Sequence, residues 1–399
     1  MLEMMNLAVP KGGDAPSSEV LPENIQAQEG VVMFLHPTSG NLYGYGANPG
    51  YRLGNGSTTN RQGFSQLRTN CKYFWLGAVG TLIATRDDKL YYVGSSASFT
   101  PLGVGGGTNI ASFTEITNYF TEHSITPDDI KTVSLGSTSC RILLKDGRIF
   151  CCGLNSNGEC GTGNINSVPR LIHVPNFGIV SKMNTTRYGT HTLKEDGTAW
   201  FTGYDAYGES GMGALGARAL YPVQIMTDVV DIITTTYVTW WIKSNGDVYW
   251  AGRNTEGSAG TGGSNPANTV NSPIKNEALS GTLSGERILY PLHALSAENT
   301  GAPLINLNMN TLKNGGLNNS GQVGDGISYN TVFSYIDMVK PAGFEAKTVI
   351  GIAKDIRRTF VLTSDNSIYA CGGASGTGFQ TPDGRSSLTP LAFMQTFNI

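Results

Sequence analysis

Carboxylates and histidines are the first residues to consider for chemistry in this chain of 399 residues. A glycoside hydrolase needs two carboxyl groups roughly 5 to 10 Å apart, and the glycine-rich segments carry four carboxylates that we expect to be exposed: Asp205, Glu209, Glu256 and Asp325. Sequence spacing in a ring of repeats does not establish whether any two of them face each other. The histidines are scattered, and none lies in an HExxH or GxSxG arrangement: His36, His123, His173, His191 and His293. We therefore predict no catalytic residues and no enzyme, with a propeller-type glycan lyase or hydrolase as an alternative.

The cysteines do not predict a disulfide or a metal site. If Lys145 pairs with Arg148 across the turn Asp146-Gly147, Cys140 lies opposite Gly153 and only diagonal to Cys151, about 7 to 8 Å away, too far for a bond. Cys152 and Cys371 each precede a glycine at a position that favours small apolar residues, which predicts buried thiols. No CxxC pair is present, so we expect no zinc and no other bound metal.

Glycine-rich boxes such as Gly153-Leu-Asn-Ser-Asn-Gly158-Glu-Cys-Gly161-Thr-Gly163 resemble phosphate-binding loops only superficially. A phosphate-binding loop leads into a helix, and the Walker type ends in GK[ST], whereas these boxes lead into proline-containing strands without such a lysine. The segment from Asn155 to Glu159 also has too few carboxylates for a calcium loop. We expect no cofactor, and we expect the glycines to permit backbone conformations with positive φ.

The boxes recur along the chain and set its organisation. Their first glycines are Gly46, Gly94, Gly153, Gly203, Gly252, Gly316 and Gly372. Six residues before each box lies a hairpin tip between two runs that favour strand, and pairs such as Asp146-Gly147 and Asn245-Gly246 predict two-residue type I′ turns. An apolar strand follows most boxes, often with proline near its start, and another strand precedes the next hairpin. Four strands per repeat are typical of one propeller blade.

This pattern of hairpin, glycine box and proline-containing strand resembles the regulator of chromosome condensation repeat family over residues 31–399. The resemblance implies an all-β fold, a seven-bladed β-propeller of four-stranded blades. The chain ends one strand after its last box, which predicts that the N-terminal and C-terminal strands pair and close the ring. The best-known member of the family is a guanine nucleotide exchange factor for a small GTPase, but its catalytic residues do not map onto this sequence.

Residues 1–30 are expected to form an arm separate from the propeller. Two interpretations stay open: a disordered tail, or a docking peptide that inserts Leu2, Met4, Met5, Leu7 and Val9 into a partner. The arm lacks the cationic segment and apolar core of a signal peptide, and no stretch is long and apolar enough for a membrane span. A soluble protein made in a cytoplasm is expected.

Binding residues are expected where the repeats are interrupted and at variable positions of the boxes. The longest interruptions lie near residues 103–130 and 262–300. Phe113, Ile116, Tyr119 and Phe120 in the first have the spacing of a short amphipathic helix, and the second contains Tyr290. Aromatic residues and arginines dominate protein interfaces, and five such residues lie in the boxes: Tyr51, Arg52, Tyr204, Tyr207 and Arg253. Packing within and between blades is the alternative for all of them.

Composition favours a rigid binding module. The net charge is −3 and only 14% of residues are charged, so no basic patch for nucleic acid is expected. Low charge, 52 glycines and the N-terminal arm favour a non-enzymatic bacteriophage virion component, such as a tail, baseplate, decoration or adhesion protein. Its partners would be other virion or scaffold proteins, a host surface receptor or a glycan, with assembly in the host cytoplasm. The alternative is a cytoplasmic protein-interaction propeller of the guanine-nucleotide-exchange-factor type.

Overall fold

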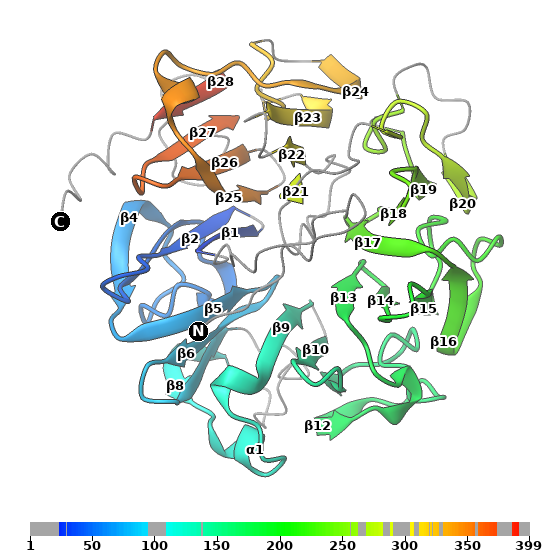
Figure 1. Cartoon of the computed structure of the whole chain (residues 1–399). Coiled ribbons are helices and arrows are strands. Elements are labelled where there is room, and N and C mark those ends of the chain that lie inside the picture. Colours follow the sequence, from blue (N-terminus) through cyan, green and yellow to red (C-terminus); the bar gives the residue numbers. More distant parts are fainter. Residues whose placement is uncertain are drawn as a thin grey trace.

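The computed structural model describes residues 24–28, 30–94, 109–136, 139–255, 257–261, 269–281, 288–289, 304–306, 311–318, 320, 322–326, 330–355, 358–372 and 385–390. The fold is an all-β propeller whose blades are four-stranded antiparallel sheets. Figure 1 shows the sheets arranged around a common centre, with the first strand of each sheet innermost. No helix in the described part is long and apolar enough to cross a membrane.

Each sheet contains four strands that are consecutive in the chain, and each strand pairs with the next. The first two sheets contain β1 (Ile25–Gln28), β2 (Val31–Leu35), β3 (Leu42–Gly46), β4 (Arg61–Arg68), β5 (Cys71–Leu76), β6 (Gly80–Thr85), β7 (Leu90–Gly94) and β8 (Ile110–Glu115). The next two contain β9 (Ile130–Leu135), β10 (Ser139–Leu144), β11 (Ile149–Gly153), β12 (Val168–His173), β13 (Lys182–Thr185), β14 (Gly189–Leu193), β15 (Ala199–Tyr204) and β16 (Arg218–Met226). The remainder contain β17 (Val229–Thr234), β18 (Val238–Lys243), β19 (Val248–Arg253), β20 (Thr269–Lys275), β21 (Ile288–Leu289), β22 (Leu304–Asn306), β23 (Thr311–Asn318), β24 (Asn330–Asp337), β25 (Val349–Lys354), β26 (Arg358–Thr363), β27 (Ile368–Gly372) and β28 (Arg385–Pro390). Short helical turns are α1 (Asn118–Thr121), η1 (Pro49–Tyr51), η2 (Pro127–Asp129), η3 (Pro175–Phe177) and η4 (Phe344–Ala346).

The expectation of seven equal blades in a ring closed by strand pairing needs correction. Six sheets have four strands of at least four residues, whereas in the sheet β21–β24 the inner strands have two and three residues. This sheet follows the longest gap between boxes, and most of its inner half lies outside the described residues. The N-terminal strand β1 pairs with β2, and β28 pairs with β27. Strand pairing between the two ends of the chain therefore does not close a ring within the described part.

The hairpin tips differ from the expected type I′ turns. Leu144 N donates to Arg148 O and Gly147 N donates to Leu144 O, so the loop has three residues, Lys145 to Gly147. Only its third residue has positive φ, +86° at Gly147, and Asp88 (+59°) and Asn366 (+61°) occupy the same place in other sheets. This is a type I turn followed by a left-handed residue. An Asp-Gly pair suits both turns, because each has a positive φ at its last position, which glycine adopts most readily.

The longer loop shifts the strand register by one residue. Cys140 lies opposite Cys152, and Arg141 lies opposite Cys151; the expected pairing of Cys140 with Gly153 was therefore wrong. All six cysteines are nevertheless buried thiols that form no disulfide, as expected for Cys152 and Cys371.

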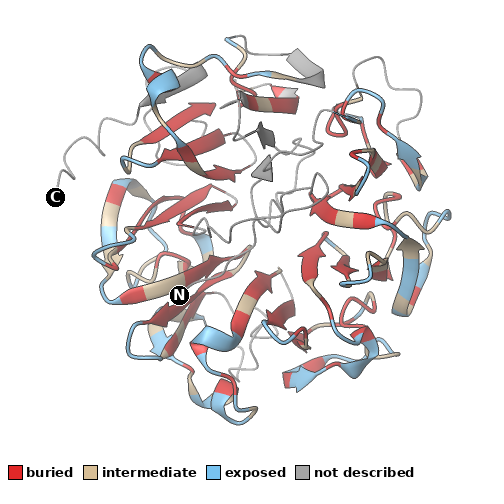
Figure 2. Cartoon of the chain, viewed as in Figure 1, coloured by how far each residue is buried: buried red, intermediate tan, exposed pale blue. Residues whose placement is uncertain are grey.

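Apolar side chains fill the spaces between neighbouring sheets. Figure 2 shows buried inner strands and more exposed outer strands such as β12 and β16. One cluster joins Met33 and Leu42 to Phe74 of the second sheet, and another packs Ile232 and Trp241 against Leu193 of the preceding sheet. The core is therefore a series of layers between blades.

The first and last sheets of the chain meet through side chains. One buried cluster contains Ile25, Val32 and Tyr45 from β1–β3 together with Phe360 and Leu362 from β26. The rings of Tyr45 and Phe360 are 6.3 Å apart, edge to face. Packing of side chains thus joins these two sheets.

Removing Phe360 should test this junction. Phe360→Ala leaves a cavity between the first and last sheets, so we expect the free energy of unfolding to fall by about 3 to 5 kcal/mol. Chemical denaturation followed by tryptophan fluorescence measures the change. Ile274→Ala, on the exposed face of β20, is the control and should stay within about 0.5 kcal/mol of the parent protein. Equal effects of the two substitutions would show that the junction does not contribute to cooperative stability.

Candidate protein-binding surface

Each glycine box begins where a strand leaves its sheet in a conformation that requires glycine. Gly203 and Gly252 both have φ of +125°. A Cβ atom at Gly252 would lie 2.0 Å from the carbonyl oxygen of Tyr237, and one at Gly203 would lie 2.3 Å from that of Tyr188. These glycines therefore serve backbone conformation and close passage of two chain segments, as the sequence predicted.

A recurrent side-chain hydrogen bond closes the box loop. The residue two positions after the first glycine accepts a hydrogen bond from the backbone N–H five residues further on. The donor–acceptor distances are 2.9 Å at Asn48 and Asn155, 3.3 Å at Asp205, 2.8 Å at Asn254 and 3.0 Å at Asn318. Sequence analysis missed this bond, although the repeated Asn or Asp was its signal.

Four tyrosines come together on the loops of two neighbouring sheets. Tyr207 follows β15 and packs edge to face on Tyr237, which lies between β17 and β18, with ring centroids 4.5 Å apart. Tyr204, at the end of β15, packs on Tyr188 before β14 at 6.2 Å. These four rings form the apolar part of the surface.

Three arginines border the tyrosines. The guanidinium of Arg253 lies 5.5 Å from the ring centroid of Tyr237 and 5.9 Å from that of Tyr207. Arg218 lies 5.5 Å from the Tyr204 ring, and Arg187 lies 5.2 Å from the Tyr188 ring. Arg187 also donates to the hydroxyl of Tyr237 at 3.3 Å. We call these seven residues the Tyr–Arg surface: Arg187, Tyr188, Tyr204, Tyr207, Arg218, Tyr237 and Arg253.

The Tyr–Arg surface is accessible but rigid. Arg187 and Arg218 are exposed, Tyr188, Tyr204, Tyr207 and Arg253 are half-buried, and Tyr237 is buried. Because the rings and guanidinium groups already contact one another, these side chains lose little rotamer freedom when a partner binds. Aromatic and arginine side chains in such a setting are typical anchors of protein interfaces.

The structure brings together three of the predicted binding residues, Tyr204, Tyr207 and Arg253. Arg187, Tyr188, Arg218 and Tyr237 were missed by sequence analysis. Tyr188 and Tyr237 do have a sequence signal, because both immediately precede the second strand of their repeat. A comparison of that loop between repeats would have found them.

The structure places the other predicted binding residues elsewhere in the fold. Arg52 is 1% exposed and donates to the carbonyl of Gln28 at 3.2 Å, so it joins segments of its own sheet. Tyr51 is half-buried in η1 with φ of +66°. Phe120 is fully buried in the core between the second and third sheets, which removes it as a binding anchor.

The first interruption of the repeats is not the expected amphipathic helix. Phe113 lies in strand β8, Ile116 follows it in the core, and only Tyr119 and Phe120 lie in the short helix α1. Tyr119 is half-buried against the same core. Strand pairing with β7 takes precedence over the helical spacing. Tyr290 and the arm residues Leu2, Met4, Met5, Leu7 and Val9 lie outside the described residues.

Two carboxyl groups lie buried beneath the Tyr–Arg surface. Asp205 and Glu209 are both 0% exposed, which corrects the expectation that they are exposed. Burial raises the pKa of Glu209 to about 8, and the neighbouring Asp205 contributes; burial also raises the pKa of Asp205. Asp205 Oδ2 and Glu209 Oε1 are buried without another hydrogen-bond partner. A proton held between the two carboxyl groups would give each of these oxygens a partner.

The preceding repeat shows why Glu209 keeps its proton. Glu159 occupies the same box position, and burial raises its pKa as well, but the positive charge of Arg141 opposes that effect. His191 takes the place of Arg141 on the next sheet, two residues after the start of the strand. Burial lowers the pKa of His191 to about 3, so this imidazole is neutral. It contacts Thr239 Oγ1 at 3.2 Å, consistent with the structural role expected for it.

The remaining carboxylate candidates form no second acidic pair in the described part. Asp325 is half-buried and accepts a hydrogen bond from Asn318 Nδ2 at 2.9 Å. Glu256 lies outside the described residues. Among described residues, no group of three or more His, Cys, Asp or Glu side chains is arranged to hold a metal ion.

The acidic pair should make stability depend on pH. The folded protein keeps a proton on Glu209 that the unfolded chain releases, so the free energy of unfolding should fall as pH rises from 4.5 towards about 8. Glu209→Gln should remove most of this slope and stabilise the protein near pH 8 by on the order of a few kcal/mol. Urea denaturation at a series of pH values measures the effect. Glu159→Gln is the matched control and should flatten the profile much less; an unchanged slope in Glu209→Gln would rule out the shared proton.

Comparisons with known proteins agree with this geometry. Residues 146–184 and residues 130–159 match models of the regulator of chromosome condensation (RCC1) repeat. Among solved structures, Prp20p from Saccharomyces cerevisiae is 13% identical, with a TM-score of 0.69 over 88% of this chain and 86% of that one. Human WBSCR16 is 17% identical, with a TM-score of 0.64 over 83% and 85% of the two chains. The chain therefore has the fold of RCC1-like propellers and carries RCC1 repeat sequence within residues 130–184.

Proposed function

We propose that this chain is a non-enzymatic protein-interaction propeller that binds a protein partner through the Tyr–Arg surface. The observation that carries the proposal is the contiguous, partly exposed array of four tyrosines and three arginines on rigid box loops. Two structural neighbours support it, because one crystal structure contains Kap60 bound to yeast RCC1 (Prp20) and another concerns binding of Prp20p to Gsp1p and histones. Kap60, Gsp1p and histones are partners of the yeast protein and are not assigned to this chain.

The proposal includes a closed ring of seven blades. The chain has seven glycine boxes, and its first and last sheets already pack together. Closure holds neighbouring loops at fixed distances, so that residues from two repeats can form one binding surface. The sheet β21–β24 would be the least regular blade.

The comparisons favour a cellular interaction protein over the expected virion component. The RCC1 repeat matches and the propeller neighbours support the former, and none of these matches supports a bacteriophage tail or host attachment role. The absence of enzymatic activity and the location, in a virion or in a cytoplasm, stay predictions.

Substitutions on the Tyr–Arg surface test the proposal. We expect Tyr207→Ala combined with Arg253→Ala to lower the recovery of the main partner in quantitative affinity purification by about tenfold or more, since loss of two interface anchors costs at least about 1.4 kcal/mol. Tyr221→Ala is the matched control, because Tyr221 lies on β16 of the same sheet and is 57% exposed but outside the surface. Equal recovery with the double variant and the control would contradict the assignment.

A nucleotide-release assay separates the exchange-factor alternative from other interaction roles. A small GTPase recovered as the partner should release its nucleotide faster in the presence of this chain if the chain acts as an exchange factor. The Tyr207→Ala, Arg253→Ala variant should lose that acceleration. Binding without acceleration would leave an interaction module as the function.

A further inference from the structure

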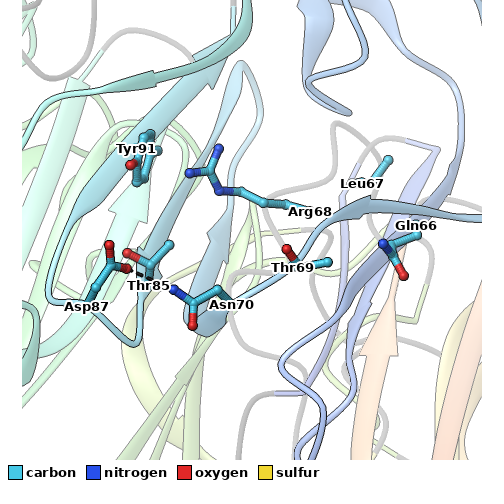
Figure 3. Close-up of a pocket in the computed structure, with 8 residues that line it drawn as sticks. All are labelled: Gln66, Leu67, Arg68, Thr69, Asn70, Thr85, Asp87 and Tyr91. Atoms are coloured by element: carbon cyan, nitrogen blue, oxygen red, sulfur yellow. Dashed lines mark hydrogen bonds between the residues drawn. The ribbon is translucent and has the colours of Figure 1, made fainter.

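A polar pocket lies between the first two sheets, at the ends of their strands opposite the glycine boxes. Its volume is about 430 Å³, within the usual range for small-ligand sites. Figure 3 shows its walls: Arg68, Thr69 and Asn70 from the end of β4 and the turn after it, Thr85 and Asp87 from the β6–β7 hairpin, and Tyr91 from β7. None of these residues belongs to the Tyr–Arg surface.

Arg68 is held in the pocket by aromatic contacts. Its guanidinium lies 3.7 Å from the ring centroid of Tyr91 and 5.9 Å from that of Phe113. Figure 3 shows the Arg68 side chain directed towards Tyr91. Stacking fixes the plane of the guanidinium and leaves its N–H groups at the edge free to donate. Within the described part of the chain, the Arg68 side chain takes part in no hydrogen bond or ion pair.

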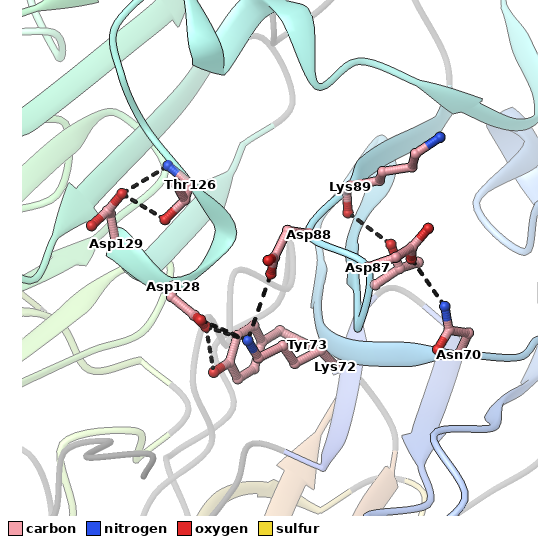
Figure 4. Close-up of polar contacts among 10 residues, drawn as sticks. Asn70, Lys72, Tyr73, Asp87, Asp88, Lys89, Thr126, Asp128 and Asp129 are labelled. Atoms are coloured by element: carbon pink, nitrogen blue, oxygen red, sulfur yellow. Dashed lines mark hydrogen bonds and ion pairs between the residues drawn. The ribbon is translucent and has the colours of Figure 1, made fainter.

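The charged neighbours of Arg68 have other partners. Lys72 Nζ lies 2.6 Å from the carboxylate of Asp128 and 3.8 Å from that of Asp88, and Figure 4 shows it between the two. Lys89 pairs with Glu115 at 3.1 Å. These carboxylates are therefore paired with lysines. Among the described residues, none forms a direct ion pair with Arg68.

Asp87 supplies a fixed negative charge at the other side of the pocket. Its carboxylate accepts a hydrogen bond from Asn70 Nδ2 at 2.9 Å, and a hydrogen bond from Thr85 lowers its pKa, so it is ionised at neutral pH. A ligand with a second carboxylate beside Asp87 would be repelled. A ligand with an N–H or O–H group at that position would donate a hydrogen bond to Asp87.

We propose that this pocket binds a polar ligand that carries a carboxylate. The carboxylate forms a bidentate hydrogen-bonded ion pair with Arg68, and Asp87 accepts a hydrogen bond from an N–H or O–H group of the same ligand. An arginine presents paired donors that match the two oxygens of a carboxylate. The stacking on Tyr91 already orders the guanidinium, so formation of such a pair costs less conformational entropy. The carboxylate belongs either to a free small molecule or to an acidic side chain of a bound peptide.

Isothermal titration calorimetry on the full chain tests the proposal with three probes: N-acetylglycine, the capped peptide acetyl-Gly-Glu-Gly-amide, and acetyl-Gly-Gln-Gly-amide. We expect saturable binding of at least one carboxylate probe and none of the glutamine peptide. A preference for N-acetylglycine indicates a free ligand, and a preference for the glutamate peptide indicates an acidic segment. Absence of saturable binding by both carboxylate probes, or equal binding of the glutamine peptide, overturns the proposal.

Substitutions assign the binding to Arg68. Arg68→Gln should weaken binding of the preferred carboxylate probe by about ten- to a hundredfold, the usual effect of losing a charged hydrogen-bonded pair. Tyr91→Leu should weaken it by about two- to fivefold through loss of the stacking. Arg61→Gln is the matched control on the same strand, because Arg61 Nη1 bonds Ser65 Oγ at 2.7 Å and does not line the pocket. Thermal unfolding confirms that each variant is folded. Unchanged affinity in folded Arg68→Gln overturns the proposal, and its failure leaves the Tyr–Arg surface unaffected.

Discussion

The hydrogen bond that a box Asn or Asp accepts from the backbone N–H five residues further on is the interaction on which the Tyr–Arg surface depends. It joins the two ends of a loop whose entry glycine has already turned the chain away from the sheet, as at Gly252 and Asn254. The loop is thereby fixed by its own backbone and one side chain. Because glycine and the Asn or Asp determine its backbone, the remaining box positions are free to vary between repeats.

The freedom to vary these box positions explains why loops with the same backbone differ in the pKa of their carboxyl groups. Glu159 and Glu209 occupy one box position, yet Arg141 faces the first and neutral His191 takes the equivalent place beside the second. The acidic pair beneath the Tyr–Arg surface is therefore a consequence of Asp205 in place of Asn155 and His191 in place of Arg141, on loops with the same backbone hydrogen bond. Its proton couples the stability of this loop to pH, since the folded chain retains it under conditions where the unfolded chain does not.

Sequence analysis predicted the features that depend on local backbone chemistry. The glycine boxes, the hairpins between strand runs, the four-stranded units and the buried thiols of Cys152 and Cys371 follow from residue type and spacing. The turn type did not, because Asp146-Gly147 fits a three-residue loop as well as a two-residue loop. The junction between the first and last sheets depends on side chains such as Tyr45 and Phe360, far apart in sequence, and no local pattern indicates it. The Tyr–Arg surface was found only in part for the same reason.

The strand connections place the two candidate surfaces on opposite faces of the propeller. Boxes connect the third strand of a sheet to the fourth, and the loops of Tyr188 and Tyr237 connect the first to the second, so both emerge at the same end of the strands. The β6–β7 hairpin and the turn after β4 emerge at the other end, where Arg68 and Asp87 line the pocket. A protein on the Tyr–Arg surface therefore leaves the pocket uncovered. Coupling between the two would have to pass through the packed sheets, which form several rigid layers, and the geometry accordingly favours independent binding.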